Sequence, residues 1–305
     1  MKSNDMTVKA SVVTVFICII FGGNTTAIKI ALDGMGAFTA AGVRFALAAL
    51  VIFCWSAYKG ISLRLTRRQL KQVCILAAIF VVQLSCFYQG LSRTTASHGV
   101  LIANVLPFFV LILAHFFIPE DRITLRKIIG ITFGFIGVVF LLLDDHHLSG
   151  DLRNGDIIIL IAVAMWSSSA VYVKRIISDY HPVKITLYPM SIATPFFFAA
   201  GLIWDDPMVS EMTNAVVMSL FYQSVVSAAF GFIVWNSMLS RFGATALHSF
   251  VFIMPLAGVL SGVLLLGETV TPFLMASIGF IVAGVMVVNL HWKKPKTVSA
   301  VEPLK

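Results

Sequence analysis

Polar and aromatic side chains that could bind a solute lie inside otherwise apolar stretches of this chain. An amide side chain in apolar surroundings needs partners or a water-filled cavity, because an unpaired amide is costly to bury. We therefore expect a central cavity lined by amides, hydroxyls and aromatic rings from several of these stretches. Its predicted lining residues are Asn24, Gln83, Tyr88, Asn104, Trp166, Ser169, Gln223, Trp235 and His248.

Each of these residue types also has a purely structural use. A serine in a membrane helix can bond to its own backbone or join two helices. Trp166 and Trp235 lie away from the ends of their apolar stretches, which favours stacking against a flat or apolar solute, with packing between helices as the alternative. His248 is either a proton carrier near neutral pH or a structural histidine with satisfied hydrogen bonds.

The sequence lacks the motifs of enzymes and of ATP-driven pumps. It contains no GxxxxGK[ST] phosphate-binding loop, no HExxH zinc motif and no GxSxG nucleophile motif. Its four cysteines stand inside apolar stretches without CxxC or metal-ligand spacing. We therefore expect no catalytic residue, no bound metal and no cofactor.

The composition identifies the lipid bilayer as the main solvent of the chain. Of its 305 residues, 59% are hydrophobic and only 12% are charged, and the mean hydropathy is +0.94. Soluble domains carry about 25% charged residues. The net charge of +8 is spread over short loops rather than one folded face, which excludes a nucleic-acid partner. The fold class is all-α, with ten predicted membrane-spanning helices at residues 10–31, 37–57, 70–90, 97–118, 126–143, 155–176, 184–204, 214–238, 246–267 and 273–292.

The distribution of Lys and Arg predicts the orientation of these helices. If the N-terminus is cytoplasmic, only Lys29, Arg44, Arg93 and Arg153 lie toward the outer side, and the remaining basic residues lie inside. Both termini, residues 1–9 and 293–305, are then cytoplasmic. The loops predicted on the outer side are acidic, and residues 145–154 form a periplasmic connector.

One stretch of the sequence occurs twice. Residues 87–120 resemble residues 235–268 at a constant offset of 148, which aligns Leu91-Ser92-Arg93 with Leu239-Ser240-Arg241, Pro107 with Pro255 and Glu120 with Glu268. The duplication divides the chain into a first repeat at 10–144 and a second at 155–292. Because five helices per repeat is an odd number, the two repeats are inverted relative to each other, as in many transporters.

The duplication also suggests which residues move. Pro107 and Pro255 each remove a backbone donor from the middle of a helix, so each is a predicted hinge or a tolerated kink. Lys29 and Glu268 end their helices at the predicted outer face, and Lys174 and Glu120 end theirs at the inner face. We predict that the two pairs are alternating gates. The alternative is lysine side chains that reach toward the interface and acidic helix ends.

These residues resemble the EamA-type ten-helix members of the drug/metabolite transporter superfamily. The resemblance covers about residues 10–290 and rests on FGGNTTAIKIAL at 21–32, VRFALAAL at 43–50, GLSRTTASHGVLIANVLPFF at 90–109, PLAGVLSGVLLLGETVTP at 255–272 and IGFIVAGVMVV at 278–288. Ile118-Pro119-Glu120 departs from the Gly-Glu that is common in such members. The resemblance implies an exporter-like secondary carrier in a bacterial inner membrane, with amino acids, related metabolites or toxic compounds as substrates.

The sequence therefore favours a carrier that binds a small molecule in a central cavity and moves it by alternating access. Drug, cofactor and nucleotide-sugar carriers of the same superfamily remain alternatives. A membrane-embedded enzyme lacks a catalytic cluster, and a passive channel does not need an inverted repeat. The glycines Gly130, Gly134, Gly137, Gly279 and Gly284 permit close helix contacts, either within the chain or in a homodimer.

Overall fold

The computed structural model describes residues 7–117, 124–143, 150–242, 247 and 250–289. Within them, eight helices are long and apolar enough to cross a membrane, and two shorter apolar helices follow. The helices are α1 (Val8–Gly22), α2 (Asn24–Leu32), α3 (Ala37–Tyr58), α4 (Arg67–Arg93), α5 (Ala96–Ala103), α6 (Leu106–Phe117), α7 (Leu125–Leu142), α8 (Gly150–Ile176), α9 (Pro182–Trp204), α10 (Asn214–Phe221), the π-helical η3 (Tyr222–Gly231), α11 (Phe232–Phe242), α13 (Ile253–Leu266) and α14 (Pro272–Asn289).

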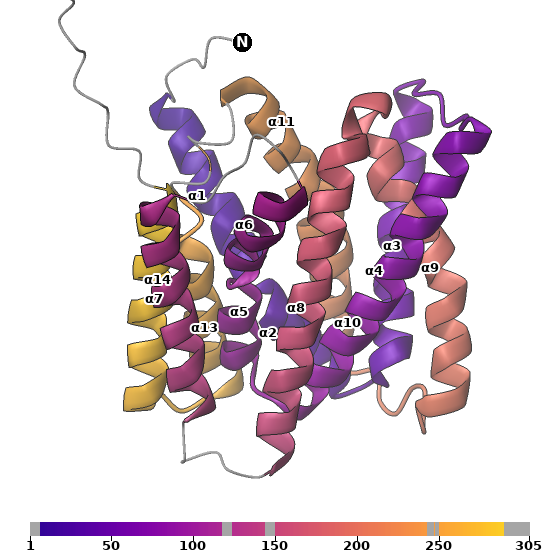
Figure 1. The fold of residues 1–305 in the computed structure, drawn as a ribbon. Helices are drawn as coiled ribbons and strands as arrows, with labels where there is room; N and C mark the ends of the chain where they lie inside the picture. The colour runs from indigo at the N-terminus through magenta and orange to yellow at the C-terminus, as the bar shows by residue number, and fades with distance from the viewer. Residues whose placement is uncertain (1–6, 118–123, 144–149, 243–246, 248–249, 290–305) are drawn as a thin grey trace, which may run out of the picture.

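Helices at equivalent positions of the two repeats pack against each other. α3 packs on α9, α7 on α14 and α5 on α13. In Figure 1 the α7–α14 pair and the α3–α9 pair flank the bundle on opposite sides, with α2, α5, α8 and α10 between them. The central helices α2 and α8 carry three of the predicted cavity residues, Asn24, Trp166 and Ser169.

The two predicted hinge prolines lie next to interruptions of their helices. The helical path breaks at Asn104 and Val105, just before Pro107, so that one predicted span becomes α5 and α6. The chain forms turns at residues 250–252, just before Pro255, and α13 begins at Ile253. A proline ring clashes with the carbonyl group four residues earlier, which explains why a helix yields at this distance from each proline.

The bundle has two ends, the Lys29 end and the opposite end. The Lys29 end holds the last turn of α2, the end of α4, the start of α5 and the end of α13. The opposite end holds the starts of α1 and α4. Since α14 starts at the Lys29 end, it finishes at the same end of the bundle as the start of α1. Gly267 ends α13 in a left-handed conformation (φ 67°), which glycine adopts without steric cost, and the chain then turns back toward α5 at Glu268.

Close contacts between backbones explain several glycines. A Cβ at Gly284 would lie 2.7 Å from the Gly130 carbonyl oxygen, and a Cβ at Gly137 would lie 3.0 Å from that of Ser277. These glycines therefore let α7 and α14 approach within one chain. Gly279 of α14 faces open space instead. The predicted homodimer stays a prediction.

Candidate functional site

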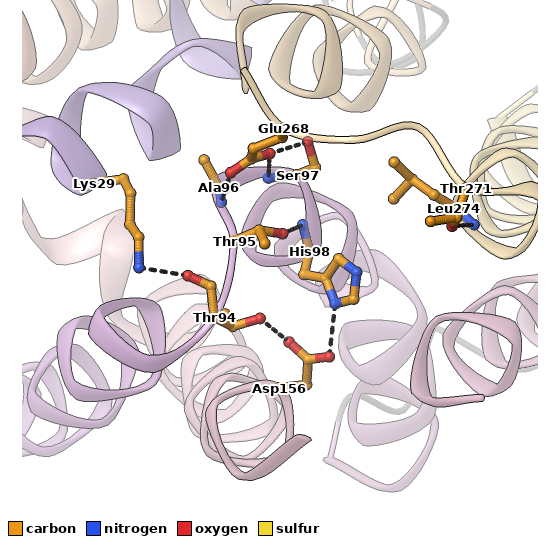
Figure 2. Close-up of polar contacts among 10 residues, drawn as sticks. All are labelled: Lys29, Thr94, Thr95, Ala96, Ser97, His98, Asp156, Glu268, Thr271 and Leu274. Carbon is orange, nitrogen blue, oxygen red and sulfur yellow. Dashed lines mark hydrogen bonds and ion pairs between the residues drawn. The ribbon is translucent and has the colours of Figure 1, made fainter. Parts of the chain in front are cut away.

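A buried turn at the Lys29 end joins α4 to α5, and charged groups surround it (Figure 2). We call this set the latch. It consists of the turn Thr94–His98 together with Lys29, Asp156 and Glu268. Thr94, Ala96, Ser97 and His98 are all buried, although they lie at the end of a membrane helix bundle. The turn is therefore enclosed by the surrounding helices at this end of the bundle.

Glu268 binds the N-terminus of α5. Its carboxylate accepts hydrogen bonds from the backbone N–H groups of Ala96 (2.6 Å) and Ser97 (2.9 Å), and also from the Ser97 hydroxyl. The Thr95 hydroxyl accepts from the His98 N–H at 3.1 Å. The first N–H groups of a helix have no partner within it and carry partial positive charge, so a carboxylate is well placed there.

Lys29 binds the other side of the same turn, at the C-terminus of α4. Its ammonium group donates to the carbonyl oxygens of Leu91 (2.9 Å), Ser92 (3.3 Å) and Thr94 (2.6 Å). The last carbonyl groups of a helix are unpaired and carry partial negative charge, so a cation is favourable there. Lys29 thereby attaches α2 to the end of α4.

Asp156 attaches α8 to the turn. Its carboxylate accepts from the Thr94 hydroxyl at 2.5 Å and lies 2.8 Å from the His98 ring nitrogen Nδ1. Both Asp156 and His98 are buried. Gly90 and Gly155 permit this approach, since a Cβ on either would lie 2.8 Å from the carbonyl oxygen of the other. The latch thus joins the first repeat, through Lys29 and the turn, to the second repeat, through Asp156 and Glu268.

The sequence predicted Lys29 and Glu268 as one gate pair. Both lie in the latch, where they hold opposite sides of one turn and form no direct ion pair with each other. Of the other predicted pair, Lys174 is exposed in the last turn of α8, and Glu120 lies outside the described residues. The gating role of both pairs stays a prediction.

A second polar cluster lies in the interior of the bundle, between α3, α4 and η3. Arg44 donates from Nη1 to the Tyr88 hydroxyl (3.3 Å), which in turn donates to Gln223 Oε1 (3.0 Å). The structure therefore brings together two predicted cavity residues, Tyr88 and Gln223. Arg44 was not predicted as a site residue, because its charge was assigned to the outer side of the membrane. The signal available in the sequence was that Arg44 lies seven residues after the start of its helix and so away from the helix end.

The other predicted cavity residues have separate surroundings. The buried amide oxygens of Asn24 and Gln83 have no hydrogen-bond partner. Asn104 donates to its own helix, at the Val100 carbonyl oxygen (2.8 Å). The rings of Trp166 and Trp235 stand edge-on to Phe87 and Phe21, respectively.

The two remaining predicted cavity residues are Ser169 and His248. Ser169 is buried in α8, and His248 lies outside the described residues.

The described part of the chain offers no group of three or more His, Cys, Asp or Glu side chains suited to a metal ion. It contains a cavity of about 190 Å³ beside the latch, lined by Thr95, Ser97, His98, Gly267, Glu268, Thr269 and Leu274. A larger one, of about 390 Å³, lies between α6 and α8 and is lined mainly by apolar residues.

Comparison with protein families identifies the class of protein to which this chain belongs. The model of the EamA-like transporter family matches residues 9–143 and again residues 153–290. The chain belongs to this family. It is therefore a multi-pass membrane transporter and not an enzyme, as the sequence predicted. The family matches the chain once in each of the two predicted repeats.

Relatives agree with this membership, and one solved structure shares the fold. The chain is 26% identical to a protein of Escherichia coli K12 named "Probable amino-acid metabolite efflux pump", over 95% of this chain and 98% of that protein. It is 24% identical to a protein of the same name from Salmonella typhimurium, over 92% of this chain and 95% of the other. A crystal structure with 16% sequence identity superimposes with a TM-score of 0.67, covering 93% of this chain and 97% of that one, which shows a shared fold.

Proposed function

We propose that this EamA-family transporter is a secondary carrier that exports amino acids or related small metabolites by alternating access. The observation that carries the proposal is the latch. It connects helices of the two predicted repeats at one end of the bundle, and the sequence holds counterparts of Lys29, Glu268, Ala96 and Ser97 that are predicted at the other end. A carrier needs two such seals that are never open together, and inverted repeats provide them.

The orientation of the seals follows from the loop charges. With ten membrane-spanning helices and both termini in the cytoplasm, the latch faces the periplasm of a bacterial inner membrane. The described structure then corresponds to a state closed toward the periplasm. At the cytoplasmic end, the counterparts of Lys29 and Glu268 are Lys174 and Glu120, and the counterparts of Ala96 and Ser97 are Ala244 and Thr245. We propose that these residues form the second seal when the latch opens.

The substrate class rests on two observations. Two relatives that match over almost their whole length are each named "Probable amino-acid metabolite efflux pump". The buried polar groups of Asn24, Gln83, Tyr88 and Gln223 suit a small polar solute better than a multiply charged anion, which would need several buried cations. Drug and nucleotide-sugar carriers of the superfamily are the alternatives within the same mechanism.

Counterflow in proteoliposomes tests the proposal. Vesicles containing the purified protein are loaded with an unlabelled amino acid, and uptake of the same labelled amino acid is measured, for each of the twenty amino acids, with and without a pH gradient. We expect saturable, transient accumulation of at least one of them. Uptake of only dyes or nucleotide sugars contradicts the substrate class. Non-saturable uptake without counterflow indicates a channel, and no uptake of any solute contradicts the carrier itself.

A further inference from the structure

Arg44 is a buried cation without a carboxylate partner. Its side chain belongs to α3 and is only 8% exposed. Among the described residues, its hydrogen-bond partner is the Tyr88 hydroxyl and its cation–π partner is the ring of Phe45, whose centroid lies 5.2 Å from the guanidinium carbon. Ionisable residues inside a membrane protein are costly, and the usual reason for keeping one is a function. An arginine held only by a hydroxyl and a ring leaves most of its positive charge uncompensated.

The unused groups of this cluster are hydrogen-bond donors. Arg44 donates to Tyr88 and Tyr88 donates to Gln223 Oε1, so the chain of bonds runs in one direction. It leaves Arg44 Nε and Gln223 Nε2 buried without acceptors. Tyr88 and Gln223 are both 0% exposed. A buried donor without an acceptor destabilises the protein, and a charged donor does so more strongly. A bound anion would satisfy both donors and the charge at once.

The position of the cluster suits a transport site. Tyr88 lies six residues before Thr94 on α4, which places it about 9 Å inward from the latch. Arg44 and Tyr88 come from the first repeat and Gln223 from the second, so the cluster spans the interface of the two halves. Gln223 is the second residue of η3, and π-helical turns inside α-helices are frequent at functional sites.

The single positive charge of Arg44 indicates the charge of the ligand. The guanidinium group offers a planar set of donors that matches a carboxylate, and a single arginine balances a single negative charge. We propose that Arg44 binds the carboxylate of the transported substrate, with Gln223 Nε2 as a second donor. The proposal rests on the proposed function and narrows it to solutes that carry one carboxylate. Because the cluster is buried in this structure, the carboxylate binds in a state with one end of the pathway open.

Three variants and one control test this assignment in the counterflow assay. Arg44→Met removes the charge at similar length, Arg44→Lys keeps the charge and loses the planar set of donors, and Tyr88→Phe removes the hydroxyl that orients the guanidinium. Ser277→Ala is the control, since Ser277 also has a buried unpaired oxygen but lies on α14. The probes are the labelled amino acids, their uncharged amides and the corresponding amines without a carboxylate.

We expect Arg44→Met to abolish counterflow of the amino acids, and Arg44→Lys to raise their KM at least tenfold with a smaller effect on kcat. We expect Tyr88→Phe to raise KM severalfold and Ser277→Ala to leave it unchanged. If Arg44→Met does not fold, the KM shifts of Arg44→Lys and Tyr88→Phe test whether Arg44 binds the carboxylate. The wild type should transport neither amides nor amines.

Two results would overturn the inference and leave the carrier intact. The first is amino-acid transport with the same KM in the wild type and the Arg44 variants. The second is equal transport of an amino acid and its amide. If the wild type moves no amino acid at all, the proposed substrate class fails and the carboxylate assignment fails with it.

Discussion

Lys29 and Glu268 form their hydrogen bonds with helix ends rather than with each other. The cation meets carbonyl oxygens at the end of α4, and the carboxylate meets N–H groups at the start of α5. Each charge therefore has the sign that its helix end requires. The sequence analysis placed both residues at one face of the membrane, but it did not reveal the backbone groups they bind, because those depend on where the turn Thr94–His98 lies in space.

The first prediction concerns an exchange of these charges. The single variants Lys29→Glu and Glu268→Lys should both lose transport, and the double variant should not recover it. In the double variant a carboxylate would face the carbonyl groups of α4, and an ammonium would face the N–H groups of α5. Proteoliposome counterflow of each variant provides the measurement. Recovery in the double variant would show that the two residues act as a direct ion pair.

Arg44 illustrates a different limit of sequence reading. Its charge near the start of an apolar stretch fitted the outer membrane surface as well as the interior. The direction of a side chain on a helix decides between the two, and that direction follows from the packing of α3 against η3 and α4. Gln83, Tyr88 and Gln223 are buried, and their predicted role as lining residues of a substrate cavity stays a prediction.

At the scale of the elements, the helical path is interrupted just before each of the two predicted hinge prolines. α5 and α6 form one predicted span, and the break at Asn104–Val105 lies where Pro107 weakens the helix. The sequence identified both prolines and their equivalence. It did not determine whether each proline would bend its helix or interrupt it, because neighbouring helices supply the alternative contacts. α9 contains Pro189 and Pro195 and remains continuous.

The second prediction tests the hinges. Pro107→Ala and Pro255→Ala should each lower kcat severalfold and change KM little, because alanine restores a backbone donor and favours a continuous, stiffer helix. Pro195→Ala is the matched control, since α9 is unbroken at that proline, and its kcat should match the wild type. Initial rates of counterflow measure the effect. Wild-type rates in both hinge variants would assign the breaks to packing alone.

The third prediction compares two glycines of α14. Gly284→Ala should destabilise the protein by about 1–3 kcal/mol, because the added Cβ would overlap the α7 backbone, which cannot move freely. Gly279→Ala should leave stability unchanged or raise it by up to about 1 kcal/mol, since its Cβ enters open space. Thermal unfolding in detergent micelles measures both. Equal effects of the two substitutions would contradict the α7–α14 contact.

At the scale of the whole molecule, the predicted duplication would let one chain hold the two related seals that we propose. The transporter family and the all-helical membrane class agree with the prediction from the sequence, and the family model matches the chain twice. The sequence predicted ten membrane-spanning helices, whereas the described residues contain eight such helices and two shorter apolar ones. The latch could not be assembled from the sequence, because its parts come from α2, the α4–α5 turn, α8 and the segment after α13, which only the packing of the two repeats brings together.

The most direct test of alternating access is a pair of distances between spin labels, one at each end of the bundle. In a background without the native cysteines, Ser92→Cys with Val270→Cys reports on the Lys29 end, and Lys9→Cys with Lys71→Cys reports on the opposite end. All four positions are exposed. Pulsed electron resonance then measures both distance distributions in proteoliposomes, for the wild type, for Glu268→Gln and for the exposed control Glu211→Gln.

We predict two populations that change in opposite directions, so that a longer distance at the Lys29 end accompanies a shorter one at the opposite end. Glu268→Gln should weaken the latch by about 1 kcal/mol and shift the populations about fivefold toward the state open at the Lys29 end. Glu211→Gln should match the wild type. Distances that lengthen together at both ends, or that do not respond to Glu268→Gln, would contradict an alternating carrier sealed by this latch.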